Sequence, residues 1–168
     1  MLDIRSWFEW VHAMPSSIAI RESLNGYTYL LTAHAISMAF FAGLIVMMDL
    51  RLVGFAFRRT PLSQVQKQLF PWQMVTMVIS GGTGLVLLYG NPLRYYGKVF
   101  FWVKMALMVL AGINALVFHF TTYRSVAAWD ISPRAPLGAR LAGAFSIALW
   151  AGVVLFGRIT AYNWMTYE

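Results

Sequence analysis

The sequence predicts an all-α integral membrane protein, built as a four-helix bundle with an N-terminal interfacial helix. Of its 168 residues, 60% are hydrophobic and only 11% are charged, too few charges to cover the surface of a water-soluble domain. The apolar residues also come in blocks that reach the length needed to cross a bilayer, about 20 residues each. Four such blocks account for the chain, so we expect a single transmembrane domain over residues 1–168.

The N-terminal segment is expected to lie along the membrane surface. Residues 3–13 mix tryptophan, phenylalanine and charge and are followed by Pro15, a pattern typical of a helix in the headgroup region. Pro71 is expected to open the second span, and Gly90-Asn91-Pro92 to close it. The four spans are predicted at about residues 27–52, 70–89, 99–120 and 140–161.

The basic residues lie between the apolar spans and indicate topology. The two loops on one side carry seven of them: Arg51, Arg58, Arg59, Lys67, Arg124, Arg134 and Arg140. The opposite loop has only Arg94 and Lys98. The positive-inside rule therefore predicts both termini on the non-cytoplasmic side. The net charge of +7 is explained by these loops, so we expect a lipid bilayer as partner and no nucleic acid.

Polar residues within the spans sort into two layers by depth. At 1.5 Å per residue, His34 lies about 10 Å below the outer end of the first span, and Lys104 about 8 Å below that of the third. These two side chains can meet. Asp49 and His119 each follow fifteen residues later, about 22 Å deeper, and form an inner layer. This depth difference argues against one haem or metal held between His34 and His119.

Each of these residues has a functional and an ordinary interpretation. His34 is a candidate haem or metal ligand, since imidazole is a common ligand and intramembrane ionisable groups mark function; otherwise it is a neutral histidine hydrogen-bonded to a neighbouring helix. Lys104 either shares that site or extends to the interface. Asp49 and His119 are solvated or paired with each other, or they form a proton path in which Asp49 orients His119.

Further residues fit around the outer layer. Gly81 and Gly82 fall near the depth of His34, where glycine allows close helix approach or leaves room for a flat ligand. Arg21 and Arg158 lie at the outer ends, where they form salt bridges or hold anionic groups such as haem propionates. The chain has no cysteine, which excludes disulfides, thiolate metal sites, iron–sulfur clusters and covalently attached c-type haem.

Four segments resemble a family of small four-helix bacterial membrane proteins of unknown function. They are AIRES (19–23), HAISMAFFAGLIVMMDLRLVG (34–54), KMALMVLAGINALVFH (104–119) and AAWD (127–130). The resemblance covers nearly the whole chain. It implies the four-helix architecture and a place in the bacterial cytoplasmic (inner) membrane, and it implies no activity.

Two features resemble, more distantly, the HemJ-type protoporphyrinogen oxidases and the CopD-like membrane domains. A first-span histidine, His34, is followed by Ala42-Gly43-Leu44 and Arg51-Leu52, and a third-span Lys104 is followed by an aliphatic run and His119. In the HemJ type the corresponding histidine and lysine are implicated in b-type haem binding and activity. Here the Lys-to-His interval is longer, and Asp49-Leu50-Arg51-Leu52 stands where the HemJ type has Pro-Arg-Leu.

The leading hypothesis is a haem b protein with a redox role, either electron transfer or oxidation of a porphyrin- or quinone-like substrate. His34 would be the axial ligand to the haem iron, with Lys104 nearby. One alternative is CopD-like transport of a metal or solute. Another is a cofactor-free accessory subunit of a membrane complex. A homo-oligomer or a redox partner protein is compatible with the haem hypothesis.

Overall fold

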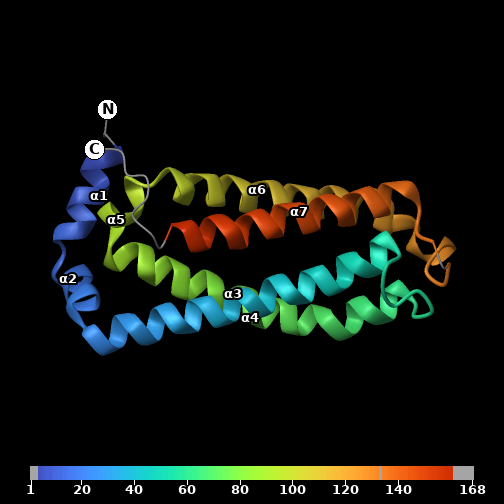
Figure 1. The fold of residues 1–168 in the computed structure, drawn as a ribbon, viewed down its shortest axis with the longest axis horizontal. Coiled ribbons are helices and arrows are strands. Elements are labelled where there is room, and N and C mark those ends of the chain that lie inside the picture. The colour runs from blue at the N-terminus through green and yellow to red at the C-terminus, as the bar shows by residue number, and fades with distance from the viewer. Residues whose placement is uncertain (1–3, 133, 161–168) are drawn as a thin grey trace.

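The computed structural model describes residues 4–132 and 134–160, and every regular element in that range is helical. Four long helices run side by side along the molecule (Figure 1): α3 (Leu24–Val53), α4 (Leu62–Gly90), α6 (Val99–Phe120) and α7 (Leu137–Ile159). Each is long and apolar enough to cross a membrane. The predicted all-α bundle of four membrane helices is confirmed.

Short helices close the two ends of the bundle. At the end we call the capped end, α1 (Ile4–Ala13), α2 (Pro15–Glu22) and α5 (Pro92–Tyr96) lie across the long helices (Figure 1). At the opposite end, the loop end, the connections include the 3-10 helix η1 (Thr122–Ala128). In α1, Phe8 and Val11 are buried while Trp7 and Trp10 are exposed, an arrangement that suits a helix in the headgroup region.

The predicted helix bounds hold except at α4. The bounds of α6 are those predicted, and α3 and α7 each begin three residues early. However, α4 begins at Leu62 rather than near residue 70, so Pro71 lies inside the helix instead of opening it. Pro61 precedes the first turn, and Leu62 and Val65 are buried at the loop end. This burial stabilises a helical turn that a proline signal alone would not predict.

Three interfaces hold the bundle together. α3 packs on both α4 and α7, and α7 also packs on α6, whereas α4 and α6 form no comparable interface. Amide side chains tie two of these pairs. Gln73 Nε2 of α4 donates to Leu44 O of α3 over 3.2 Å, and Asn114 Nδ2 of α6 donates to Ala142 O of α7 over 3.0 Å. The order across the bundle is therefore α4, α3, α7, α6, with one side left open.

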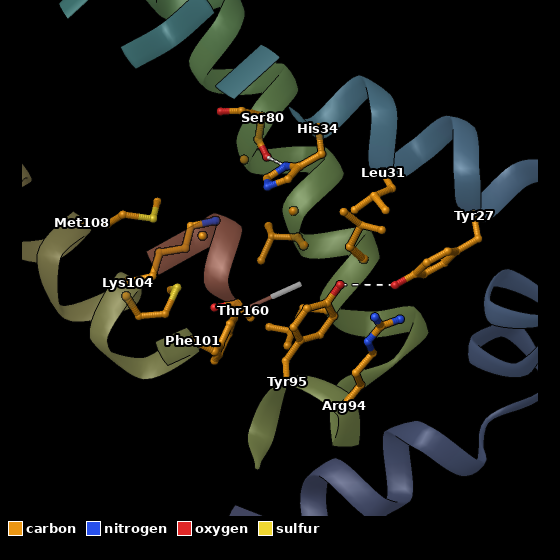
Figure 2. A pocket seen from close by; sticks show the side chains of 17 residues that line it. Tyr27, Leu31, His34, Ser80, Arg94, Tyr95, Phe101, Lys104, Met108 and Thr160 are labelled. Atoms are coloured by element: carbon orange, nitrogen blue, oxygen red, sulfur yellow. Dashed lines mark hydrogen bonds between the residues drawn. The ribbon is translucent and has the colours of Figure 1, made fainter. Parts of the chain in front are cut away.

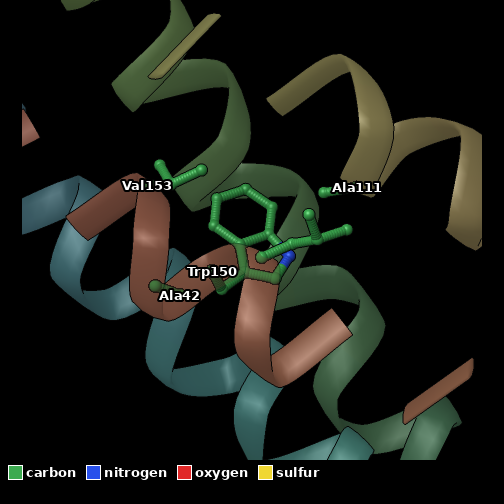
Figure 3. Close-up of a cluster of buried hydrophobic side chains, with 5 residues drawn as sticks. Ala42, Ala111, Trp150 and Val153 are labelled. Atoms are coloured by element: carbon green, nitrogen blue, oxygen red, sulfur yellow. The ribbon is translucent and has the colours of Figure 1, made fainter. Parts of the chain in front are cut away.

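The core between these helices is built around one tryptophan of α7. Trp150 lies with Ala42 of α3, Ala111 of α6 and Val153 in a buried cluster (Figure 3). Its ring also meets Phe41 edge-on, with centroids 5.0 Å apart. Small residues on α3 and α6 leave the room that this indole fills, so the three helices are held in a fixed relation.

The loop end is fixed by a buried arginine. Arg51 is 1% exposed, and its guanidinium donates to Thr60 O (2.8 Å), Asp130 O (3.1 Å) and Ser132 O (3.3 Å). Arg51 is thus a structural clamp, in addition to its predicted part in charge topology. It joins the loop after α3 to the loop before α7 and so closes this end of the bundle.

Asp130 extends this clamp to the start of α4. Its carboxylate accepts from Ser63 N (2.8 Å) and from the Ser63 hydroxyl (2.5 Å). Burial alone would raise the pKa of Asp130, but the hydrogen bonds from Ser63 and Leu62 and the charge of Arg51 outweigh it, so the pKa lies below its ordinary value. Asp130, the last residue of the AAWD segment, therefore has a structural role: it holds the loop before α7 to the start of α4.

Candidate functional site

A cavity of about 310 Å³ lies among the long helices toward the capped end (Figure 2). All four long helices and α5 contribute to its walls. Its polar lining residues are Tyr27, His34, Ser80, Arg94, Tyr95, Lys104 and Thr160. The two residues of the predicted outer layer, His34 and Lys104, thus line one cavity. Their side chains point toward each other (Figure 2) and lie close enough to interact electrostatically.

The ring of His34 is held in one orientation by α4. Nδ1 lies 2.9 Å from Ser80 O and 3.1 Å from Thr83 Oγ1. The Ser80 carbonyl can only accept, and the Thr83 hydroxyl donates to Ile79 O over 2.6 Å, so Nδ1 carries the proton. In the neutral ring Nε2 is then unprotonated, and its lone pair is available to a ligand.

A glycine of α4 lets the imidazole lie against the helix. A Cβ at Gly84 would come within 3.0 Å of His34 Cε1 and 3.4 Å of Nδ1. Of the two predicted glycines, Gly81 lines the cavity, whereas Gly82 does not. Gly82 lies about 100° further around α4 than Gly81, which turns it away from the cavity. Gly84 lies three residues after Gly81 and so on the same side of α4. This spacing would have predicted Gly84 as the second cavity glycine from the sequence.

Lys104 reaches the cavity along α7. A Cβ at Gly157 would lie 3.6 Å from Lys104 Cδ and 3.7 Å from both Cε and Nζ. The lysine stem therefore runs past a glycine, which leaves space for it. The amine is directed toward the imidazole of His34 (Figure 2), so the side chain of Lys104 points into the cavity.

A cationic residue, Arg94, lies at the capped end of the cavity. From the sequence it is predicted only as a topology charge in a loop. Arg94 of α5 is exposed and lines the cavity next to Tyr95. The Tyr95 hydroxyl lies 3.3 Å from that of Tyr27 on α3. Burial and the Tyr27 hydroxyl both raise the pKa of Tyr95, so this phenol stays neutral beside Arg94.

The two arginines predicted to lie above His34 are elsewhere. Arg21 Nη1 donates to His12 O over 2.9 Å and lies 3.2 Å from His12 Nδ1, so this side chain ties α2 to α1. Arg158 is exposed on α7. Neither lines the cavity. The position of an arginine near the outer end of a span does not reveal which way its side chain turns.

The two residues of the predicted inner layer share a depth but do not contact each other. Asp49 is buried on α3 beside the side chain of Ser146 on α7. His119 is exposed on α6, with its ring stacked on Tyr123 at a centroid distance of 5.4 Å. Both residues lie near the loop end, as their depth predicts, but α7 packs between α3 and α6. No contact therefore joins Asp49 to His119 in the structure, and the proton path stays a prediction.

In the part of the chain that the structure describes, no three histidine, aspartate or glutamate side chains gather as a metal-binding group. What the fold and the cavity define is a multi-pass membrane protein with four candidate spans and, among them, a cavity lined by histidine, lysine and arginine. The chain belongs to the family of unknown function DUF6644, whose model matches residues 7–163. No curated protein and no solved structure matches it.

The match confirms the predicted membership of a four-helix membrane protein family of unknown function. The more distant resemblance to HemJ-type and CopD-like proteins stays a prediction.

Proposed function

We propose that this protein binds a b-type haem in the cavity, with His34 as an axial ligand to the iron. The observation that carries the proposal is the orientation of the imidazole. Nδ1 is bonded to the Ser80 carbonyl at 2.9 Å, and this leaves Nε2 free on a ring that lines the cavity. Haem-ligating histidines are held in this way, with the second ring nitrogen donating to a carbonyl or carboxylate.

The other lining residues suit the same group. Apolar side chains of α4 and α6, among them Leu85, Leu88, Phe101 and Met105, exclude water from a flat hydrophobic body. Lys104 offers an amine as a second ligand or as a positive charge close to the ring. The volume of 310 Å³ falls at the lower end of the range for small-molecule pockets, about 300–1,000 Å³, before any opening of the α4–α6 side.

The proposed role is redox, because haem supplies one-electron chemistry that this chain's own side chains lack. The protein contributes the ligand, the burial and the positive charge that set the potential of the site. With the basic loops facing the cytoplasm of a bacterial inner membrane, the cavity lies toward the non-cytoplasmic side. Electrons would then be exchanged near that surface, with a quinone- or porphyrin-like substrate or a redox partner protein.

The visible absorption spectrum of detergent-purified protein, expressed with ample haem, tests the proposal. We expect a Soret band that is lost in His34→Ala and kept in His119→Ala, the matched control, because His119 is exposed and stacked on Tyr123. In His34→Gly, added imidazole should restore the band, which separates lost ligation from misfolding.

A colourless wild-type protein, or equal loss in the His34 and His119 variants, would contradict the proposal. Metal-dependent transport without haem absorption would favour the CopD-like alternative. A colourless protein whose His34→Ala variant assembles normally with its partners would favour the accessory subunit.

A further inference from the structure

The wall of the cavity is incomplete between α4 and α6. These two helices form no packed interface, although both line the cavity. Leu85 of α4 and Met105 of α6 line the cavity and are nevertheless 69% and 38% exposed. Side chains that face both the cavity and the exterior mark an opening. Because α4 and α6 are long apolar helices suited to a membrane, this opening faces the acyl chains of the bilayer.

The charge of the lining favours an anionic occupant. Among the described lining residues, the two charged ones, Arg94 and Lys104, are both cationic. They lie at different positions: Lys104 is beside His34, and Arg94 is on α5 at the capped end (Figure 2). Arg94 is exposed, so a group bound to it keeps access to water. An arginine in such a place matches a carboxylate in charge and in geometry.

We propose that the cavity takes up its ligand sideways from the membrane, between α4 and α6, and orients it by a carboxylate at Arg94. The ligand is an amphiphile with a flat apolar body toward His34 and carboxylates toward the capped end. This extends the proposed function, which supplies the identification of that body as a porphyrin. Arg94 takes the place of Arg21 and Arg158, which the fold turns away from the cavity.

The carboxylate anchor, meaning the contact of a ligand carboxylate with Arg94, is tested with metal-free protoporphyrin IX and its dimethyl ester. These two compounds differ only in the two carboxylates. Both are titrated by fluorescence into the detergent-purified full chain. We expect Arg94→Gln to weaken binding of the diacid about tenfold, as the loss of a charge-assisted hydrogen bond implies, and to leave the ester unchanged. Arg158→Gln, an exposed arginine outside the cavity, should change neither.

A porphyrin that does not bind, or an Arg94→Gln variant that treats diacid and ester alike, would overturn the anchor. Metal-free porphyrin has no iron for His34 to ligate, so this test is independent of the Soret experiment. A wild-type protein without a Soret band, but with the Arg94 effect intact, would exclude haem and keep the carboxylate anchor. A wild-type Soret band without any Arg94 effect would keep haem and exclude the carboxylate anchor.

The route is tested by closing the opening. The chain has no native cysteine, so Leu85→Cys with Met105→Cys can be bridged by a short reducible cross-linker. We expect bridging to slow protoporphyrin uptake from liposomes at least tenfold, and reduction to restore it. Leu85→Cys alone, treated with the same reagent, is the control. Unchanged uptake in the bridged protein would overturn the lateral route.

Discussion

Gly84→Ala isolates the contact that orients the proposed ligand. The added Cβ would lie 3.0 Å from His34 Cε1, whereas unstrained carbon atoms approach to about 3.5–4.0 Å. The imidazole must therefore move by about 0.5 Å or more. The 2.9 Å bond from Nδ1 to Ser80 O then stretches beyond the usual limit of about 3.2 Å.

Losing this hydrogen bond costs about 0.5–1.5 kcal/mol, which lowers the affinity for haem by up to about tenfold. The helix itself should not suffer, since alanine favours helix over glycine by about 1 kcal/mol. The assay is haem titration followed at the Soret band. Gly82→Ala is the matched control, because a Cβ there meets nothing within 4 Å. Equal haem affinity in the two variants would refute the reasoning.

Two further predictions concern the scaffold. In Gly143→Ala the new Cβ would lie 2.9 Å from Leu52 Cβ and 3.1 Å from Asp49 O, so we expect overpacking to cost about 1–3 kcal/mol of stability and to lower the Tm in detergent. Gly112→Ala is the control, because a Cβ there meets nothing within 4 Å and should not lower the Tm. Equal Tm values for the two variants would contradict this prediction. Asp130 has a lowered pKa, so its contribution is present above the unfolded pKa of about 3.9 and is lost as pH falls through the lowered folded value. Asp130→Asn should therefore lower Tm at pH 7, with the deficit shrinking below about pH 4, and a pH-independent deficit would count against the clamp.

Depth in the membrane is predictable from this sequence, but direction around each helix is not. The rise of 1.5 Å per residue is a fixed property of the α-helix, and it is enough to place His34 level with Lys104, the two residues that share the cavity. The side on which a residue lies depends on the order of helix packing, which hydropathy does not encode. For this reason Gly82 lies off the cavity, and Asp49 lies away from His119.

Some helix bounds are likewise predictable from the sequence, and others are not. The start and end of α6 are predictable because its apolar run is sharply bounded. The start of α4 is not, because Leu62 is buried by residues distant in sequence, among them Trp129 and Ala139. Arg94 has no distinguishing sequence signal, because a loop arginine is typical of a topology charge and only the placement of α5 brings it to the cavity.

The open side of the bundle also has a thermodynamic consequence. The α3–α4 and α6–α7 pairs are each neighbours along the chain, and the α3–α7 interface joins them. A molecule bound between α4 and α6 would supply the contacts that these two helices lack, and so would act as a fourth interface. Binding to the folded state alone contributes about 2.7 kcal/mol at a ligand concentration of 100 times Kd. The occupied protein should then unfold as one unit, and the rise in Tm with added ligand would measure how much of the bundle the ligand completes.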